Sequence, residues 1–166
     1  MTAGYGLCFI ARRTGFRERV PSFPMVIRLL AGCCVMALCV TIHAGGVTWA
    51  LRQLRRSPVR ALRFWGSTWL FILVAVWIVL LHLVEISVWA AVYVWNGAMA
   101  DLPTALYFSA VTYTTTGYGD LVLPKDWRLD GGVEALTGIL MCGWSTGFFF
   151  AIVNRLYEPR PSTTNV

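Results

Sequence analysis

Charged residues are scarce in this sequence. Asp, Glu, Lys and Arg together make up 13% of its 166 residues, against about 25% in a typical soluble domain. Hydrophobic residues make up 57%, and eight of them are Trp. A chain with so little charge and so much apolar surface lies outside the range of soluble globular proteins. We therefore predict an integral protein of the cell membrane.

Motifs for catalysis and metal binding are missing as well. No serine or histidine has a base and an orienting acid at a suggestive spacing, and no phosphate loop or metal-ligand motif occurs. The cysteines mostly lie inside apolar runs, without the spacing of a disulfide framework or a zinc site, and are expected to act as small hydrophobic residues. They are Cys8, Cys33, Cys34, Cys39 and Cys142. The sequence predicts that the protein is not an enzyme and needs no cofactor.

Positive charge is concentrated in two arginine-rich patches, residues 12–19 and 52–63, which supply most of the net charge of +6. Beside apolar runs, such patches mark the cytoplasmic side and contact anionic lipid headgroups, so no nucleic-acid partner is expected. The lipid-contacting arginines of the denser patch are expected to be Arg52, Arg55, Arg56, Arg60 and Arg63. We expect residues 52–66 to form a cytoplasmic linker, either as an interfacial helix interrupted at Pro58 or as a plain charged loop.

Apolar stretches long enough to cross a hydrocarbon core of about 30 Å occur at three places in the chain. They are residues 26–51, 67–95 and 133–153. They predict three transmembrane helices, with residues 1–25 and 156–166 as tails. The first stretch has one arginine near its start and so lacks the repeated arginines of a voltage sensor.

Two features of the first stretch leave alternatives open. A lipoprotein-type signal ending before Cys33 is disfavoured because the apolar run before it is short and contains Arg28. With residues 52–66 inside, an extra first helix places the arginine-rich tail outside, against the positive-inside rule. Translation from Met25 would remove that conflict, and otherwise we expect an external N-terminus.

Between the second and third stretches lies Thr-Thr-Thr-Gly-Tyr-Gly-Asp, residues 114–120. It resembles the TVGYG string of potassium-channel selectivity filters, in which backbone carbonyls replace the water around an ion. Glycine suits this task because Gly117 and Gly119 can reach backbone angles that other residues avoid. Residues 103–113 before it would span about 16 Å as a helix, too short to cross, so we predict a re-entrant pore helix. Asp101 is expected near its positive end.

Residues 67–155 resemble the pore domain of bacterial two-transmembrane potassium channels, with the first stretch as an addition. The resemblance implies an all-α homotetramer with an outer helix at 67–95, a pore helix at 103–113, a filter at 114–120 and an inner helix at 133–153. It implies K⁺ coordination by Thr115, Thr116, Gly117, Tyr118 and Gly119. It places Asp120 at the outer mouth, with Tyr118 turned from the axis toward Tyr107 and Phe108.

The sequence departs from the family pattern behind the filter. Val111 stands where the best-known relatives have a glutamate that pairs with the aspartate after the filter. Asp120 therefore needs another donor, and we expect Tyr107 or Trp127. This departure concerns slow inactivation rather than selectivity.

Four residues are candidates for gating: Gly138, Gly143, Glu85 and His82. Gly138 falls where the family carries its gating glycine, and it is either a hinge or a packing contact. Gly143 forms a GxxxG pair with Gly147, for which close helix packing is the preferred interpretation.

Glu85 and His82 lie one turn apart inside the second stretch. They form either a proton sensor or, as we prefer, a polar contact to the pore helix or inner helix. An unpaired carboxylate there would be costly, so Glu85 is expected to be protonated or bonded to a neighbour. His43 has no evident partner, and no role is assigned to it.

The sequence as a whole predicts a channel that conducts K⁺ passively through a tetrameric filter. The first alternative is a channel-like subunit that does not conduct or that regulates another channel. A membrane enzyme that uses His82 and Glu85 and a non-selective cation pore are two further alternatives.

Overall fold

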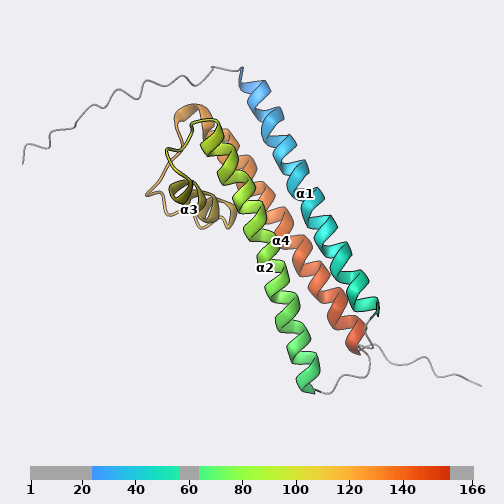
Figure 1. Cartoon of the computed structure of the whole chain (residues 1–166). Coiled ribbons are helices and arrows are strands. Elements are labelled where there is room, and N and C mark those ends of the chain that lie inside the picture. Colours follow the sequence, from blue (N-terminus) through green and yellow to red (C-terminus); the bar gives the residue numbers. More distant parts are fainter. Residues whose placement is uncertain (1–23, 57–63, 158–166) are drawn as a thin grey trace, which may run out of the picture.

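The computed structural model describes residues 24–56 and 64–157. Within these ranges the regular elements are all helical, namely α1 (Met25–Arg56), α2 (Phe64–Trp95), α3 (Leu102–Tyr113), the 3₁₀ turn η2 (Lys125–Trp127) and α4 (Arg128–Tyr157). The long helices α1, α2 and α4 form a bundle, and α3 lies beside the end of the bundle where α2 ends and α4 begins (Figure 1). The predictions for Arg60 and Arg63, and for all but two residues of each tail, fall outside the described residues.

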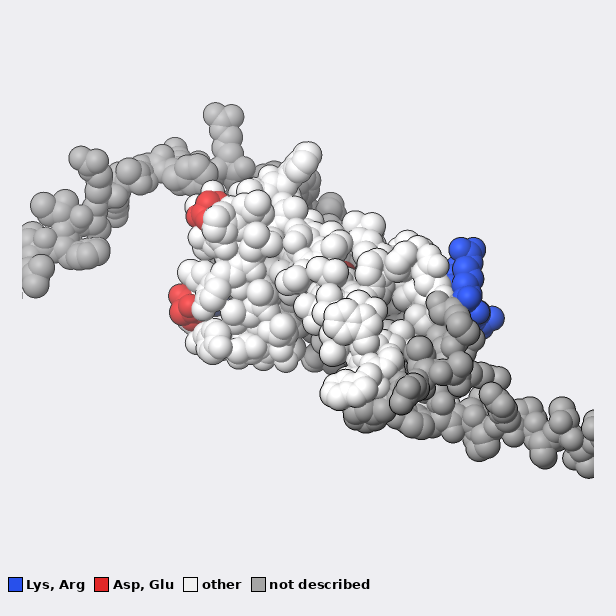
Figure 2. All heavy atoms as spheres, turned by 60° about the horizontal axis from the view of Figure 1, so that its bottom comes forward, with Lys and Arg blue, Asp and Glu red and all other residues white. Residues whose placement is uncertain are grey.

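The bundle has the character of a membrane protein. Its three long helices are each long and apolar enough to cross a bilayer. On the face shown in Figure 2, Lys and Arg gather at one end and Asp and Glu at the other, with an almost uncharged surface between them. The prediction of an all-α membrane protein with three spanning helices is therefore confirmed.

Two helix boundaries differ by five residues from those predicted, and others differ by less. Arg52, Arg55 and Arg56 continue α1 to its last turn, so the expected linker is wrong for these three residues, both as a separate interfacial helix and as a charged loop. Positive side chains at this end complement the negative end of the helix dipole. The last helix begins at Arg128, five residues before the predicted start at residue 133. Gly131 looks like a loop residue in sequence, but here it lets Leu123 pack closely against α4.

The loop between α2 and α3 is closed by local hydrogen bonds. Gly97 has φ +71°, and the N–H groups of Gly97 and Ala98 donate to Val94 and Tyr93, the pattern of a Schellman cap. Asp101 caps α3, accepting from the Thr104 backbone N–H at 2.9 Å, as expected for a carboxylate at a helix start. These hydrogen bonds hold the pKa of Asp101 below its usual value.

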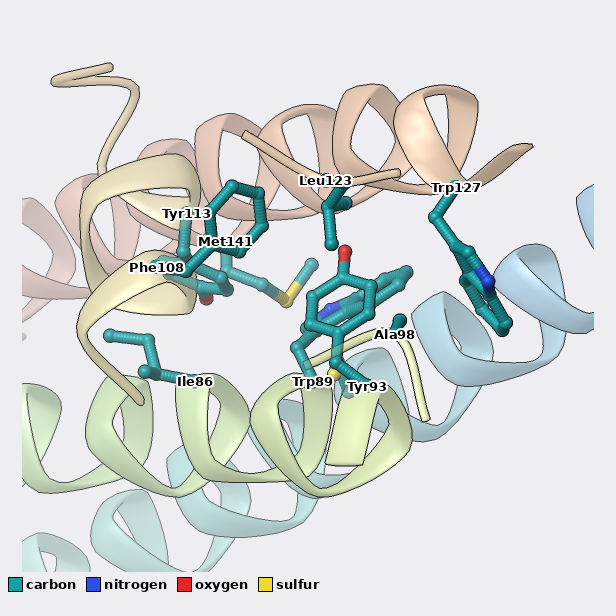
Figure 3. Close-up of a cluster of buried hydrophobic side chains, with 10 residues drawn as sticks. Ile86, Trp89, Tyr93, Ala98, Phe108, Tyr113, Leu123, Trp127 and Met141 are labelled. Carbon is teal, nitrogen blue, oxygen red and sulfur yellow. The ribbon is translucent and has the colours of Figure 1, made fainter. Parts of the chain in front are cut away.

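A core of large side chains holds α3 against the bundle (Figure 3). Its labelled members come from α2, the following loop, α3, the loop after residue 120, η2 and α4. They are Ile86, Trp89, Tyr93, Ala98, Phe108, Tyr113, Leu123, Trp127 and Met141. Tyr93 and Trp95 lie near the end of α2, where aromatic residues are typical of a membrane interface, but Tyr93 is fully buried while Trp95 is 91% exposed. Its hydroxyl donates to Glu134 at 2.8 Å, which explains why the ring turns inward.

Gly138 is the point at which α4 meets the end of α3. A Cβ built at Gly138 would lie 1.8 Å from the carbonyl oxygen of Tyr113. The packing interpretation of Gly138 is therefore the one that the structure supports. No atom of the described chain lies within 4 Å of a Cβ built at Gly143 or Gly147, so their predicted role in helix packing stays a prediction.

We predict that Gly138→Ala destabilises the protein by about 3 kcal/mol, the upper end of the usual overpacking cost, because its Cβ meets backbone. Gly132→Ala is the matched control in the same helix, since nothing lies within 4 Å of its Cβ. Thermal unfolding in detergent should show a lower melting temperature for Gly138→Ala alone. Equal melting temperatures for the two variants would contradict the close contact.

Candidate functional site

The segment after α3 has an unusual backbone. Thr115, Gly117 and Gly119 have φ of 58°, 55° and 77°, so every second residue is left-handed. Both glycines thus have the angles that the sequence analysis expected, and Thr115 adopts the same region despite its Cβ. In a backbone of alternating handedness, N–H groups face one side and carbonyl groups face the other.

The N–H groups of this segment point back to α3. Thr115 donates to the Thr112 carbonyl at 2.9 Å, and Thr116 and Gly117 both donate to the Val111 carbonyl, at 2.9 and 3.2 Å. The last turn of α3 therefore uses its free carbonyls to hold the segment. The N–H groups of Thr115, Thr116 and Gly117 thus face α3, and in an alternating backbone this leaves the other side to the carbonyl groups. Residues 114–120 are all exposed in the single chain.

The acidic end of the segment is fixed by an aromatic side chain. The Tyr107 hydroxyl donates to Asp120 Oδ2 at 2.8 Å, so the first of the two expected donors is confirmed. Trp127, the other candidate, is buried in the core instead. Tyr118 is 71% exposed, so its predicted neighbours Tyr107 and Phe108 are not settled by the single chain.

Behind the segment, a closed ring of hydrogen bonds joins all four helices. Glu85 and His82 come from α2, His43 from α1, Tyr113 from α3 and Ser145 from α4. The ring runs from Glu85 Oε1 to His43 Nδ1 at 2.9 Å, from His43 Nε2 to Ser145 Oγ at 3.1 Å, and from Ser145 Oγ to His82 Nε2 at 3.1 Å. It continues from His82 Nδ1 to the Tyr113 hydroxyl at 3.0 Å and closes where that hydroxyl donates to Glu85 Oε2.

Counting protons shows which charge state this ring requires. Five hydrogen bonds need five hydrogens, and Tyr113, Ser145 and two neutral imidazoles supply four of them, while an ionised Glu85 supplies none. The fully bonded ring therefore holds one proton more, and in that state it carries no net charge. A neutral ring is the form favoured by its burial, since His43 and Glu85 are both 0% exposed.

The ring contains two predicted site residues and three that sequence reasoning did not connect with them. Glu85 bonds to neighbours, as expected, and its contact with Tyr113 confirms the predicted polar contact to the pore helix. The conclusion that His43 has no partner is wrong. His43, Tyr113 and Ser145 lie far from Glu85 in sequence. The only sequence feature that could have identified them is that each is a polar residue beside or within an apolar run.

A second polar contact fastens α1 near its N-terminal end, whereas His43 lies near the middle of the helix. Arg28 is buried, and its guanidinium lies 4.9 Å from the centroid of the Trp127 ring. It is also close enough to Asp130 to interact with its charge. Helix α1 is thus attached to the rest of the chain at Arg28 and at His43.

Comparison with known proteins gives one match. Residues 72–155 match the model of a protein family described as ion channel, and this range covers most of α2, all of α3 and nearly all of α4. Neither the curated proteins nor the solved structures contain a match to this chain. Helix α1 lies outside the matched range.

We predict that Tyr113→Phe lowers the stability by about 1–3 kcal/mol, because it leaves buried polar atoms of Glu85 and His82 without their partner. Tyr107→Phe is the matched control, since it removes an exposed hydroxyl. Thermal unfolding of both variants in detergent tests this prediction. An unchanged melting temperature for Tyr113→Phe would show that the ring contributes nothing to stability.

Proposed function

Because the chain belongs to the ion channel family whose model covers residues 72–155, we propose that it is a potassium-selective channel. In this proposal K⁺ moves passively down its electrochemical gradient, and no catalytic step or cofactor is involved. The ion loses its water on entry, and backbone oxygens replace that water. The residues that would supply these oxygens are Thr115, Thr116, Gly117, Tyr118 and Gly119.

The alternating backbone at Thr115, Gly117 and Gly119 is the observation that carries this proposal. It gives consecutive carbonyl groups a common direction, which a single coordinating row requires. The hydrogen bonds from Thr116 and Gly117 to Val111 keep the N–H groups on the opposite side. A row of adjacent carbonyl sites also allows several ions to repel one another, so that none remains bound for long.

One such row cannot surround an ion, so the proposal requires four copies around an axis. The single chain offers apolar surface for such an assembly, because α4 exposes several large side chains. They are Leu136, Ile139, Leu140, Trp144 and Phe150. Gly143 and Gly147 lie on the same helix without an intrachain contact, which suits close approach of another chain.

The charge distribution suggests an orientation. The end of α1 that carries Arg52, Arg55 and Arg56 would face the cytoplasm and anionic headgroups. Helix α3 and Asp120 would then lie toward the outside, with α3 re-entering the membrane. The negative end of the α3 dipole would point inward and help to hold a cation in a central cavity.

We predict a potassium-selective, barium-sensitive flux from purified protein in liposomes, and we predict that Gly119→Ala abolishes the flux or its selectivity. A Cβ at Gly119 meets nothing within 4 Å, so the defect would come from the left-handed backbone at φ +77°. Gly45→Ala is the matched control, because its Cβ is equally unobstructed but lies in regular helix. It should leave the flux unchanged.

Other outcomes of the same experiment would contradict the proposal in distinct ways. Equal passage of Na⁺ and K⁺ would indicate a non-selective cation pore. Silence across pH and voltage would indicate a channel-like subunit that needs another protein. Normal selective flux from Gly119→Ala would remove the filter from the mechanism.

A further inference from the structure

The hydrogen-bond ring also has the composition of a metal site. His43, His82 and Glu85 each offer one ligand atom, and these atoms all lie within 4.8 Å of one another. They are two imidazoles and one carboxylate, the ligand set of many zinc centres with three protein ligands. Nothing in the proposed conduction mechanism uses this set.

Several of the distances already approach those around a bound metal ion. His43 Nδ1 lies 2.9 Å from Glu85 Oε1, and His82 Nδ1 lies 3.5 Å from Glu85 Oε2. Around a tetrahedral Zn²⁺ with ligand distances of about 2.1 Å, neighbouring ligand atoms are roughly 3.4 Å apart. Side-chain shifts of roughly 1 Å would therefore bring the ligand atoms to that spacing. The Tyr113 oxygen contacts both Glu85 and His82, and so is available as a fourth ligand.

Ser145 supplies the hydrogen-bond partner that metal-bound histidines usually have on the ring nitrogen that faces away from the metal. Its Oγ lies 3.1 Å from Nε2 of both histidines. In the metal-bound state both Nε2–H groups would donate to this oxygen, which leaves both Nδ1 lone pairs free for the ion. Metal-bound histidines are generally oriented by such a partner on their other ring nitrogen. Ser145 also borders a hollow of about 480 Å³ that is lined by α2 and α4.

We propose that His43, His82, Glu85 and Tyr113 bind one divalent transition-metal ion of the Zn²⁺ type in exchange for two protons. The neutral ring holds five hydrogens. After exchange, three remain, one on each Nε2 and one on Ser145 Oγ. Tyr113 binds as a phenolate and Glu85 as a carboxylate, so two negative charges balance the ion. The site stays neutral throughout, which its burial favours.

The preference for a borderline transition metal follows from the ligands. Imidazole suits Zn²⁺, Cu²⁺ and Ni²⁺, whereas Mg²⁺ and Ca²⁺ require oxygen ligands.

The other ionisable groups near Glu85 are the thiols of Cys39 on α1 and Cys142 on α4, both close enough to interact with its charge. The tests therefore use a protein in which every cysteine except buried Cys39 is replaced by serine, namely Cys8, Cys33, Cys34 and Cys142.

The test is a titration of this purified protein with Co²⁺, a visible probe for zinc sites, in competition with Zn²⁺. We expect one ion per chain, with the intense visible absorption of a tetrahedral site and no sulfur charge-transfer band. His43 and His82 are the chain's only histidines, so His43→Gln should lose the signal while keeping a hydrogen-bonding group opposite Glu85. Ser145→Ala keeps every ligand and should weaken binding about 10–100-fold.

The pH dependence tests the exchange itself. Release of two protons predicts an apparent affinity that rises about 100-fold for each pH unit. A pH-independent affinity, equal binding by wild type and His43→Gln, or only the weak absorption of hydrated Co²⁺ would overturn the proposal. Since these measurements need no ion flux, their outcome is separate from that of the liposome experiment.

Discussion

Burial of the Glu85 carboxyl group is the constraint on which the rest of the structure depends. A carboxyl group at 0% exposure within an apolar bundle is costly unless polar partners surround it. Here its direct partners from other helices are His43 of α1 and Tyr113 of α3. Ser145 of α4 joins them through the two histidines, so satisfying one side chain ties all four helices together. Helix α1, which lies outside the range matched by the ion channel family, joins that arrangement through His43.

The same arrangement fixes the end of α3. The Tyr113 side chain belongs to the ring, while its carbonyl oxygen rests on Gly138 of α4. One residue later the chain enters the alternating segment, whose N–H groups return to Val111 and Thr112. The proposed filter thus starts from a residue held by both its side chain and its backbone. A strand that must present carbonyl groups to an ion needs such a rigid base, because coordination depends on the positions of its oxygens.

Local sequence patterns sufficed for much of this architecture. The long apolar runs predicted three spans, Asp101 was expected at the start of α3, and the family resemblance left Asp120 in need of a donor, for which Tyr107 was one of two candidates. Contacts between distant helices could not be predicted, because they depend on how each helix is rotated in the bundle. For that reason His43 was left without a partner. The early start of α4 was missed because glycine has a low helix propensity, which argues against a helix at Gly131. In the structure, the close packing of Leu123 against Gly131 outweighs that low propensity.

An experimental structure of the purified assembly in lipid, determined in potassium, tests the central claim most directly. The account predicts four chains around one axis, with the carbonyls of residues 115–119 facing it and ion density between them. It also predicts α3 pointing its last turn toward that axis, with the Glu85 ring behind it. A monomeric protein, or an assembly in which this segment lies away from the axis, would contradict the account.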